Sequence, residues 1–275
     1  MFKYDFEEGV IKYFNKFLLI CPLVLVSIVM FETRTNYIMS IFGESATSLE
    51  MGINTFFGRY PFEFDIGKKQ IFLIPFEWLI IYAYLAMLIG DYFNNDLNGF
   101  GMLVMINSYN RGIWWCSKCL RIVFVSIGHF IVIWGTIISY EWIRYGKVSF
   151  VKNKQYFIET FGTQLNNLNI NKLHIMLIVM PILVGIVQSL FQLVLNIYLK
   201  SDISMIIILG ILVFSSYYSN KYIIHGYSMI CRYCANYANY DFNPLDISFG
   251  MKYLFLLCVV LYIMGLFMIK RKDIM

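Results

Sequence analysis

The sequence predicts an all-α, polytopic membrane protein with six transmembrane helices. Of its 275 residues, 59% are hydrophobic and 14% are charged, and the mean hydropathy is +0.65. A soluble domain has roughly 45–50% apolar and about 25% charged residues, so this chain has too few ionic side chains to cover a water-facing surface. The net charge of +5 is spread along the chain, unlike the basic stripe of a nucleic-acid-binding protein. The composition therefore disfavours a soluble enzyme, a disordered chain and a nucleic-acid binder.

Windows without charged residues give the position of each span, because a helix needs roughly 17–25 apolar residues to cross the hydrocarbon. Only Glu77 interrupts the second window, and the first is long enough if Lys16 snorkels and the helix begins near Phe14. An even number of spans places both termini on the same side of the membrane. The six windows are 17–31, 70–90, 122–140, 173–199, 203–220 and 253–269.

The segments outside the spans differ in length and composition. Residues 1–16 contain acidic residues that do not suit a signal peptide. Their apolar residues recur at helical spacing, so we expect an amphipathic helix that lies in the membrane interface. A plain helical extension of the first span is the alternative. Residues 32–69 are expected to form a long outer loop, and 199–202 a tight helical hairpin. The cluster Lys270-Arg271-Lys272 beside the last span favours cytoplasmic termini. Residues 1–275 are expected to form a single transmembrane domain.

The sequence contains no ATP-binding P-loop, no zinc-hydrolase motif and no Gly-x-Ser-x-Gly nucleophile motif. The pairs Gly67-Lys68 and Gly146-Lys147 lack both the earlier glycine and the following Ser or Thr of an ATP-binding P-loop. The three histidines are isolated and form no His-Glu-x-x-His zinc motif. We therefore expect a chain that is not an enzyme and that carries no cofactor and no metal of its own.

Two Cys-x-x-Cys pairs, Cys116/Cys119 and Cys231/Cys234, form the sharpest apparent motif. Four thiolates brought together can hold zinc, and a single pair can act as a redox dithiol. Three spans separate the two pairs, so they are expected on opposite faces of the membrane and cannot share a metal. Packing cysteines are the simpler interpretation, with a disulfide as the alternative for the second pair.

Polar residues inside the predicted spans mark the next candidate site, because an acid at the centre of a span costs roughly 2.5–3.5 kcal/mol. Glu77 is predicted about a third of the way along the second span, where it either lines a translocation path or hydrogen-bonds a neighbouring helix. A polar stripe at spacings of three and four follows the fourth span, and it either joins helices or lines the same path. Its polar members are Gln188, Gln192 and Asn196, with Pro181 and Gly185 on the same face.

The inner segment 92–118 has the most specific pattern. Its charge-free run 97–110 is too short to cross a membrane, so we expect a short helix or re-entrant element there that needs a partner surface. The residues after this run are predicted to anchor the chain at the membrane interface, with tryptophans at headgroup level and basic side chains beside anionic lipids. These anchors are Trp114, Trp115, Lys118 and Arg121.

This layout resembles the ABC-2 type permeases, the six-span membrane subunits of bacterial ABC exporters. The similarity rests on the span count, the charged-then-apolar inner loop, the tight turn after the fourth span and the Lys-Arg-Lys-Asp-Ile end. The pattern Arg111-x-x-Trp114-Trp115-x-x-Lys118 is similar to that of antibiotic- and bacteriocin-related permeases. The long first outer loop departs from the family and indicates an additional outer cap.

The resemblance implies export of a peptide or amphipathic, antibiotic-like substrate across a bacterial cell membrane, with a role in antibiotic resistance or bacteriocin immunity. It implies outer re-entrant helices within 222–250, cytoplasmic termini, and a second permease subunit in a homo- or heterodimer. It also implies that the inner element is a coupling helix that docks on a separate ATPase, which binds ATP and Mg. The coupling residues would be Leu97, Met102, Val104, Met105 and Arg111.

Two other functions remain open at this point. One is a peptide-sensing or immunity subunit, which holds a peptide at the outer loops without net transport. The other is a membrane redox protein that uses its Cys-x-x-Cys pairs. A co-purifying ATPase that responds to peptide tests the first, and thiol alkylation tests the second.

Overall fold

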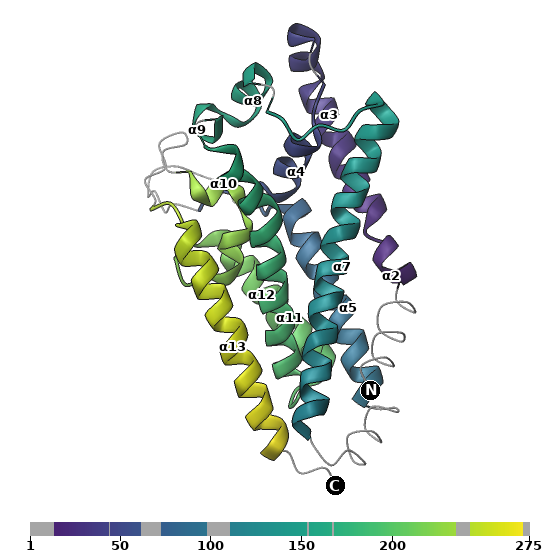
Figure 1. Cartoon of the computed structure of the whole chain (residues 1–275), viewed down its shortest axis with the longest axis vertical. Coiled ribbons are helices and arrows are strands. Elements are labelled where there is room, and N and C mark those ends of the chain that lie inside the picture. Colours follow the sequence, from purple (N-terminus) through teal and green to yellow (C-terminus); the bar gives the residue numbers. More distant parts are fainter. Residues whose placement is uncertain are drawn as a thin grey trace.

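The computed structural model describes residues 14–43, 45–61, 73–97, 111–152, 154–166, 168–234 and 243–271. Within these residues the chain is helical and has no strand, which confirms the predicted all-α class. Long helices run side by side along one axis, and shorter ones gather at the upper end (Figure 1). The elements are α2 (Phe14–Leu18), α3 (Cys21–Phe42), α4 (Ser48–Phe56), α5 (Phe76–Leu97), α7 (Arg111–Tyr145), α8 (Lys154–Phe161), α9 (Thr163–Asn166), α10 (Ile170–His174), η2 (Ile175–Val179), α11 (Met180–Leu195), α12 (Ser201–Tyr217), η3 (Ile224–Ser228), η4 (Ile230–Tyr233) and α13 (Ile247–Arg271).

Four helices of the described chain are long and apolar enough to cross a membrane. Two shorter apolar helices, Phe76–Gly90 and Ser201–Tyr217, fall in the second and fifth predicted windows. The helix lengths and compositions thus indicate a membrane-embedded protein with four helices of spanning length. These four are Asn15–Phe42, Arg111–Tyr145, Ile170–Leu195 and Ile247–Arg271.

Charged residues at the ends of the predicted windows lie inside longer helices. α3 continues through Glu32 to Phe42, so the prediction that 32–69 is a loop is wrong over its first part. The hydroxyls of Tyr140 and Tyr145 in α7 donate hydrogen bonds of 2.8 and 2.7 Å to the Glu32 carboxylate. Because these donors satisfy the carboxylate inside the protein, the charge does not end the helix.

α5 begins later than its predicted window, at Phe76. Pro75 has no backbone N–H and a fixed φ, which suits the residue at a helix start and not one inside a helix. Residues 73–75 are accordingly not helical. The predicted depth of Glu77 is therefore wrong: the residue lies in the first turn of α5.

α3 is displaced along the bundle relative to α5. The hydroxyl of Tyr84, near the middle of the apolar part of α5, donates a hydrogen bond to the carbonyl of Lys16, at the start of the first long helix. Ser27 of α3 consequently lies beside Glu77 at the start of α5. The far end of α3 projects above the other long helices (Figure 1).

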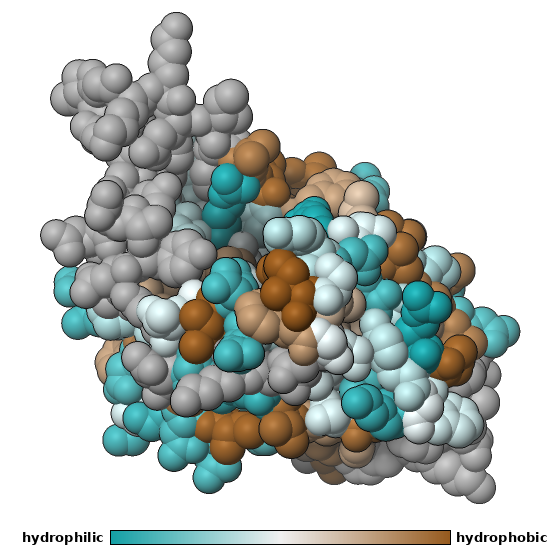
Figure 2. All heavy atoms as spheres, turned by 90° about the horizontal axis from the view of Figure 1, so that it is seen from above, coloured by the Kyte–Doolittle hydropathy of each residue, from teal (hydrophilic) through white to brown (hydrophobic). Residues whose placement is uncertain are grey.

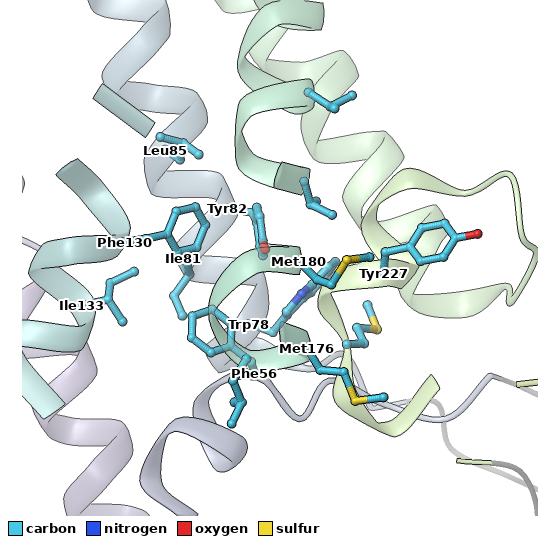
Figure 3. Packing of buried hydrophobic residues seen from close by; sticks show 14 of the residues in the cluster. Phe56, Trp78, Ile81, Tyr82, Leu85, Phe130, Ile133, Met176, Met180 and Tyr227 are labelled. Atoms are coloured by element: carbon cyan, nitrogen blue, oxygen red, sulfur yellow. The ribbon is translucent and has the colours of Figure 1, made fainter. Parts of the chain in front are cut away.

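α11 lies at the centre of the bundle, where it contacts α5, α7, α12 and α13. A short turn at 196–200 joins it to α12, which confirms the predicted tight hairpin. The Ser204 hydroxyl donates to the side-chain oxygen of Asn196 across this turn. Aromatic and methionine side chains from several elements fill the core around Trp78 and Tyr82 (Figure 3).

Two glycines on α13 leave room for large aromatic rings. A Cβ added at Gly250 would lie 2.6 Å from the Tyr227 ring, and one added at Gly265 would lie 2.0 Å from the Trp115 indole. Both distances are shorter than carbon atoms tolerate, so close approach of the rings requires glycine. At 1.5 Å per residue, the two sites are roughly 22 Å apart along the helix. Tyr227 and Trp115 therefore pack against α13 at opposite ends of the bundle.

The upper end of the bundle carries a helical cap formed by α4, α8 and α9. The ring of Phe161 in α8 stacks on Phe31 of α3 with centroids 5.8 Å apart. The buried Glu141 carboxylate of α7 accepts hydrogen bonds from the backbone N–H of Ser48 at 2.9 Å and of Ser149 at 3.1 Å. Seen from above, this end is a mixture of hydrophilic and hydrophobic residues (Figure 2). Of these three helices, α4 lies within the predicted loop 32–69.

Candidate functional site

A cavity of about 190 Å³ lies between α3 and α5, next to α4. Its walls are apolar apart from Ser27, Thr55 and Glu77. The Thr55 hydroxyl already donates to the Met51 carbonyl of its own helix, at 2.9 Å. Glu77 is therefore the one charged side chain among the lining residues. The apolar walls are formed by Ile20, Leu23, Val24, Val26, Met30, Phe76, Ile80 and Ile81.

Three helices position the Glu77 carboxylate. Ser27 of α3 donates its hydroxyl to Glu77 Oε2 at 2.8 Å, and Asn54 of α4 donates its side-chain N–H to the same atom at 3.1 Å. A capping box in which Thr47 and Glu50 each accept a backbone N–H of the other fixes the start of α4, and with it Asn54. Glu77 itself lies in the first turn of α5, where the helix dipole favours a negative charge.

The Glu77 carboxylate can accept more hydrogen bonds than the described residues donate to it. Both hydrogen bonds fall on Oε2, and no residue in the described ranges donates to Oε1. The two donors, a hydroxyl and an amide, are neutral, and no described lysine or arginine forms an ion pair with Glu77. Since a carboxylate can accept about four hydrogen bonds, the site has room for a cationic donor.

The mouth of the cavity is apolar and lies on the flank of the bundle. Four of its lining side chains are largely exposed: Phe76 by 68%, Val26 by 56%, Met30 by 50% and Leu23 by 43%. The deeper wall is closed by the buried side chains of α3 and α5. The cavity therefore opens sideways between the two helices, and Glu77 lies at its polar side.

The polar stripe of α11 joins helices instead of lining this cavity. Gln188 donates its side-chain N–H to the carbonyl of Tyr82 at 2.9 Å, and Gln192 donates to that of Ala86 at 2.8 Å. Both acceptors belong to α5, and both glutamines are fully buried. Asn196 is buried in the hairpin turn. These hydrogen bonds favour the helix-joining alternative, and none of the three residues lines the Glu77 cavity; that they line a translocation path stays a prediction.

A buried histidine, which was not predicted as a site residue, extends this polar contact. His225 of η3 approaches Gln188 Oε1 with its Nε2 at 2.8 Å. Its Nδ1 is buried, and no described residue hydrogen-bonds it. Burial lowers the pKa of His225 to about 3, so the ring is neutral and donates through Nε2. The residue was not predicted because it is separated from Gln188 by a whole helix in the sequence.

The four predicted interface anchors lie inside the protein, so their assignment to lipid headgroups is wrong. α7 begins at Arg111, well before its predicted window, and turns this face toward α13. The Trp115 indole donates to the carbonyl of Tyr262 at 2.9 Å, and the Lys118 ammonium lies over the Trp114 ring, 5.5 Å from its centre. The buried anchors are Trp114, Trp115, Lys118 and Arg121, all at most 5% exposed.

The predicted coupling residues fall mostly outside the described part of the chain. Met102, Val104 and Met105 lie outside the described residues, and Leu97 is described only as the last residue of α5. Arg111 begins α7 and reaches the carbonyls of the last turn of α13, with Nη1 at 3.4 Å from that of Ile269. A guanidinium at this position complements the negative end of the α13 dipole.

The two cysteine pairs are free thiols at opposite ends of the bundle. Cys119 lies one turn from Trp115 on α7, whereas Cys231 lies in η4 near the other end. Burial raises the pKa of Cys231 to about 12 and that of Cys234 to about 11, which lowers their reactivity at neutral pH. Among the described residues, no cluster of three or more His, Cys, Asp or Glu side chains could hold a metal.

Within the predicted re-entrant segment 222–250, residues 225–234 are buried against the bundle, whereas Tyr222 and Phe249 are exposed. Arg232 of η4 has no exposed surface and donates from Nη2 to the carbonyls of Ser216 at 2.7 Å and Ser215 at 3.4 Å. Burial lowers its pKa to about 10. These carbonyls belong to the last turn of α12, whose dipole stabilises a positive charge. Residues 235–242 lie outside the described chain.

Of the three polar residues at the site, only Glu77 was predicted from the sequence. Ser27 is a polar residue within the first charge-free window, which is a signal that could have indicated it. Asn54 carries no such signal, because it reaches Glu77 only when α4 folds back against α3 and α5.

Comparison with known proteins places the chain in a family. A sequence profile described as "Protein of unknown function (DUF2705)" matches residues 63–275. The matched region contains Glu77 and α5, whereas Ser27 and Asn54 precede it. No curated protein and no solved structure matches the chain. Because the match covers more than three quarters of the sequence, the chain belongs to the DUF2705 family.

Proposed function

We propose that the chain is a membrane-spanning permease subunit of an ABC exporter, in which ATP hydrolysis by a separate ATPase drives the movement of an amphipathic substrate. The Glu77 cavity carries the proposal. It combines apolar walls with one carboxylate that has no ion pair among the described residues. A pocket with apolar walls and few polar groups is the common form of a ligand site.

In such a permease, all six apolar helices would span the membrane. α5 has 22 residues and α12 has 17, which gives lengths of roughly 33 and 25 Å. Both lengths are close to the hydrocarbon thickness of about 30 Å, and small mismatches are met by tilt or local thinning. Six crossings and a buried segment before α13 suit a permease.

The basic end of the bundle would face the cytoplasm. Arg111 at the start of α7 contacts the backbone carbonyl of Lys270, beside Arg271 at the end of α13. Basic residues next to spans favour the cytoplasmic side. The chain between α5 and α7 would then meet the ATPase there, with Leu97, Met102, Val104, Met105 and Arg111 at the contact, and a second permease subunit would complete the path.

A peptide-sensing or immunity subunit is the second candidate function, and the cap favours it. The buried carboxylate of Glu141 joins α7 to the start of α4 and to the loop after α7. A rigid surface of this kind on the outer face suits recognition of a peptide without transport. The redox alternative loses support from the burial and raised pKa of Cys231 and Cys234.

Purification of the tagged chain from its native membrane in mild detergent tests the proposal. We expect a P-loop ATPase to co-purify and to hydrolyse ATP, because the chain has no P-loop of its own. A Met102→Asp, Met105→Asp double variant should lose the ATPase, whereas Glu159→Gln on the exposed surface of α8 should retain it. Purification without any ATPase would contradict the proposed function. An ATPase stimulated by peptide, with no movement of any substrate, would favour the sensing alternative.

A further inference from the structure

We propose that the Glu77 cavity binds the head of a single-chain cationic amphiphile, with an ammonium or guanidinium group at the carboxylate and the first carbons of the chain against the apolar wall. The inference rests on the proposed function insofar as it names the class of substrate. Binding itself is a property of this chain and does not require the ATPase.

The carboxylate selects a cation that can donate hydrogen bonds. Ser27 and Asn54 both donate to Oε2, which fixes the plane of the group and leaves Oε1 for a ligand. Because both partners are neutral, an ionised Glu77 has no compensating charge from them. A ligand N–H⁺ would supply that charge through a short, charge-assisted hydrogen bond.

The walls disfavour a small hydrophilic cation. A hard metal ion such as Ca²⁺ takes six to eight oxygen ligands, whereas the lining offers one carboxylate and two hydroxyls that already donate elsewhere. A polyamine has several charges, and the lining has a single acid. The remaining wall consists of aliphatic and aromatic side chains, which would desolvate a second charge at a cost.

The volume limits how much of the ligand lies inside. Pockets for drug-sized molecules measure roughly 300–1,000 Å³, and this cavity measures about 190 Å³. It therefore has room for a head group and a few carbons, and it excludes a folded peptide. The exposed apolar side chains of Leu23, Val26 and Met30 at the mouth would support the rest of an alkyl chain.

The sideways opening provides the route of entry. In a bilayer, the exposed face of α3 would lie against lipid, so an amphiphile already dissolved in the membrane could enter from the side. The displacement of α3 relative to α5 is what places Ser27, and hence the mouth, beside the start of α5. Access would thus need no opening along the axis of the bundle.

Equilibrium binding to the purified chain in phosphatidylcholine nanodiscs tests the inference, with radiolabelled dodecylguanidinium as the probe and empty nanodiscs as the partition background. We expect saturable binding to the native chain and to Glu159→Gln. Glu77→Gln keeps an acceptor oxygen for Ser27 and Asn54, so it should fold, and it should weaken binding roughly tenfold or more. Leu23→Trp, which fills the mouth and leaves the carboxylate intact, should weaken binding similarly.

Four results would overturn the inference. One is the lack of saturable binding to the native chain. Another is equal affinity of the Glu77→Gln and native proteins for the probe. The third is binding of dodecanol and dodecyl sulfate as tight as that of dodecylguanidinium. The fourth is loss of probe binding when phosphatidylethanolamine is added to the nanodisc, since this would assign the cavity to a lipid head group. Co-purification of an ATPase without probe binding would leave the proposed function standing and remove the inference alone.

Discussion

Trp115 occupies the space that Gly265 leaves open on α13, and its indole N–H donates to the carbonyl of Tyr262 at 2.9 Å. This contact fixes α7 against α13 at the basic end of the bundle. It also explains why Trp115 lies inside this protein, although tryptophan favours membrane interfaces. Gly265 of α13 leaves space for the indole ring, and the carbonyl of Tyr262 accepts its N–H.

Gly265→Ala should destabilise the protein by about 1–3 kcal/mol, because the new methyl group would collide with the indole and force it to move. Thermal unfolding in detergent measures the change. Gly210→Ala is the matched control, since a Cβ at Gly210 meets no atom within 4 Å and alanine favours a helix. Equal melting temperatures for Gly265→Ala and the native protein would show that Trp115 does not fill this space.

Glu141→Gln should loosen the cap without unfolding the bundle. The substitution replaces one carboxylate oxygen by an N–H₂ group, which faces a backbone N–H of Ser48 or Ser149 without accepting from it, at a cost of about 1–3 kcal/mol. Hydrogen exchange should therefore speed up across α4 and remain unchanged in α11. Glu159→Gln makes the same chemical change at an exposed site and should leave exchange unaffected. Unchanged protection of α4 in Glu141→Gln would refute this role.

Stability should fall with acidity because of His225. Its folded pKa of about 3 lies below the unfolded value of about 6.5, so the unfolded state binds the extra proton between these values. This contribution is complete above about pH 6.5 and is lost as the pH falls, by about 2 kcal/mol at pH 5. His225→Gln retains a donor for Gln188 Oε1 but cannot take up a proton. Melting temperatures at pH 7 and 5 should therefore differ less in the variant, and an equal drop in both would contradict the assignment.

Cys231 and Cys234 should resist alkylation in the folded protein. Their thiols are buried and their pKa values are raised, so almost no thiolate is present at pH 7.5. A variant that retains only these two cysteines should react with a maleimide after denaturation and hardly at all before it. A Cys-free protein with Ser40→Cys, at an exposed position of α3, is the reactive control. Rapid native labelling, or labelling that requires a reductant, would revive the redox hypothesis.

Much of the helix order could be predicted from the sequence, because charge-free windows report hydrophobic stretches directly. The helix ends could not. Glu32 and Arg121 mark the edges of two windows but lie inside longer helices. A charge ends a span only if it must reach water, and hydroxyls from α7 make this unnecessary for Glu32. Such partners come from distant parts of the chain, which a local pattern does not report.

Of the three polar residues of the candidate site, Glu77, Ser27 and Asn54, only Glu77 could be predicted from the sequence. Glu77 is visible as a lone acid in an apolar window, and Pro75 marks the true start of its helix. The geometry that makes it a site depends on the displacement of α3 and on the return of α4 with Asn54. For the polar stripe of α11, by contrast, the spacing in the sequence suits either a translocation path or a contact between helices. The structure shows that Gln188 and Gln192 donate to carbonyls of α5.

ATP-driven movement of a cationic amphiphile tests the central claim most directly. The complex of this chain with its co-purified ATPase would be placed in proteoliposomes with the ATPase outward, and internal dodecylguanidinium would be measured after ATP addition. The native complex and Glu159→Gln should accumulate the probe, and Glu77→Gln should accumulate roughly tenfold less while still retaining the ATPase. Accumulation that is equal in Glu77→Gln and the native complex, or no accumulation despite active ATP hydrolysis, would contradict the account.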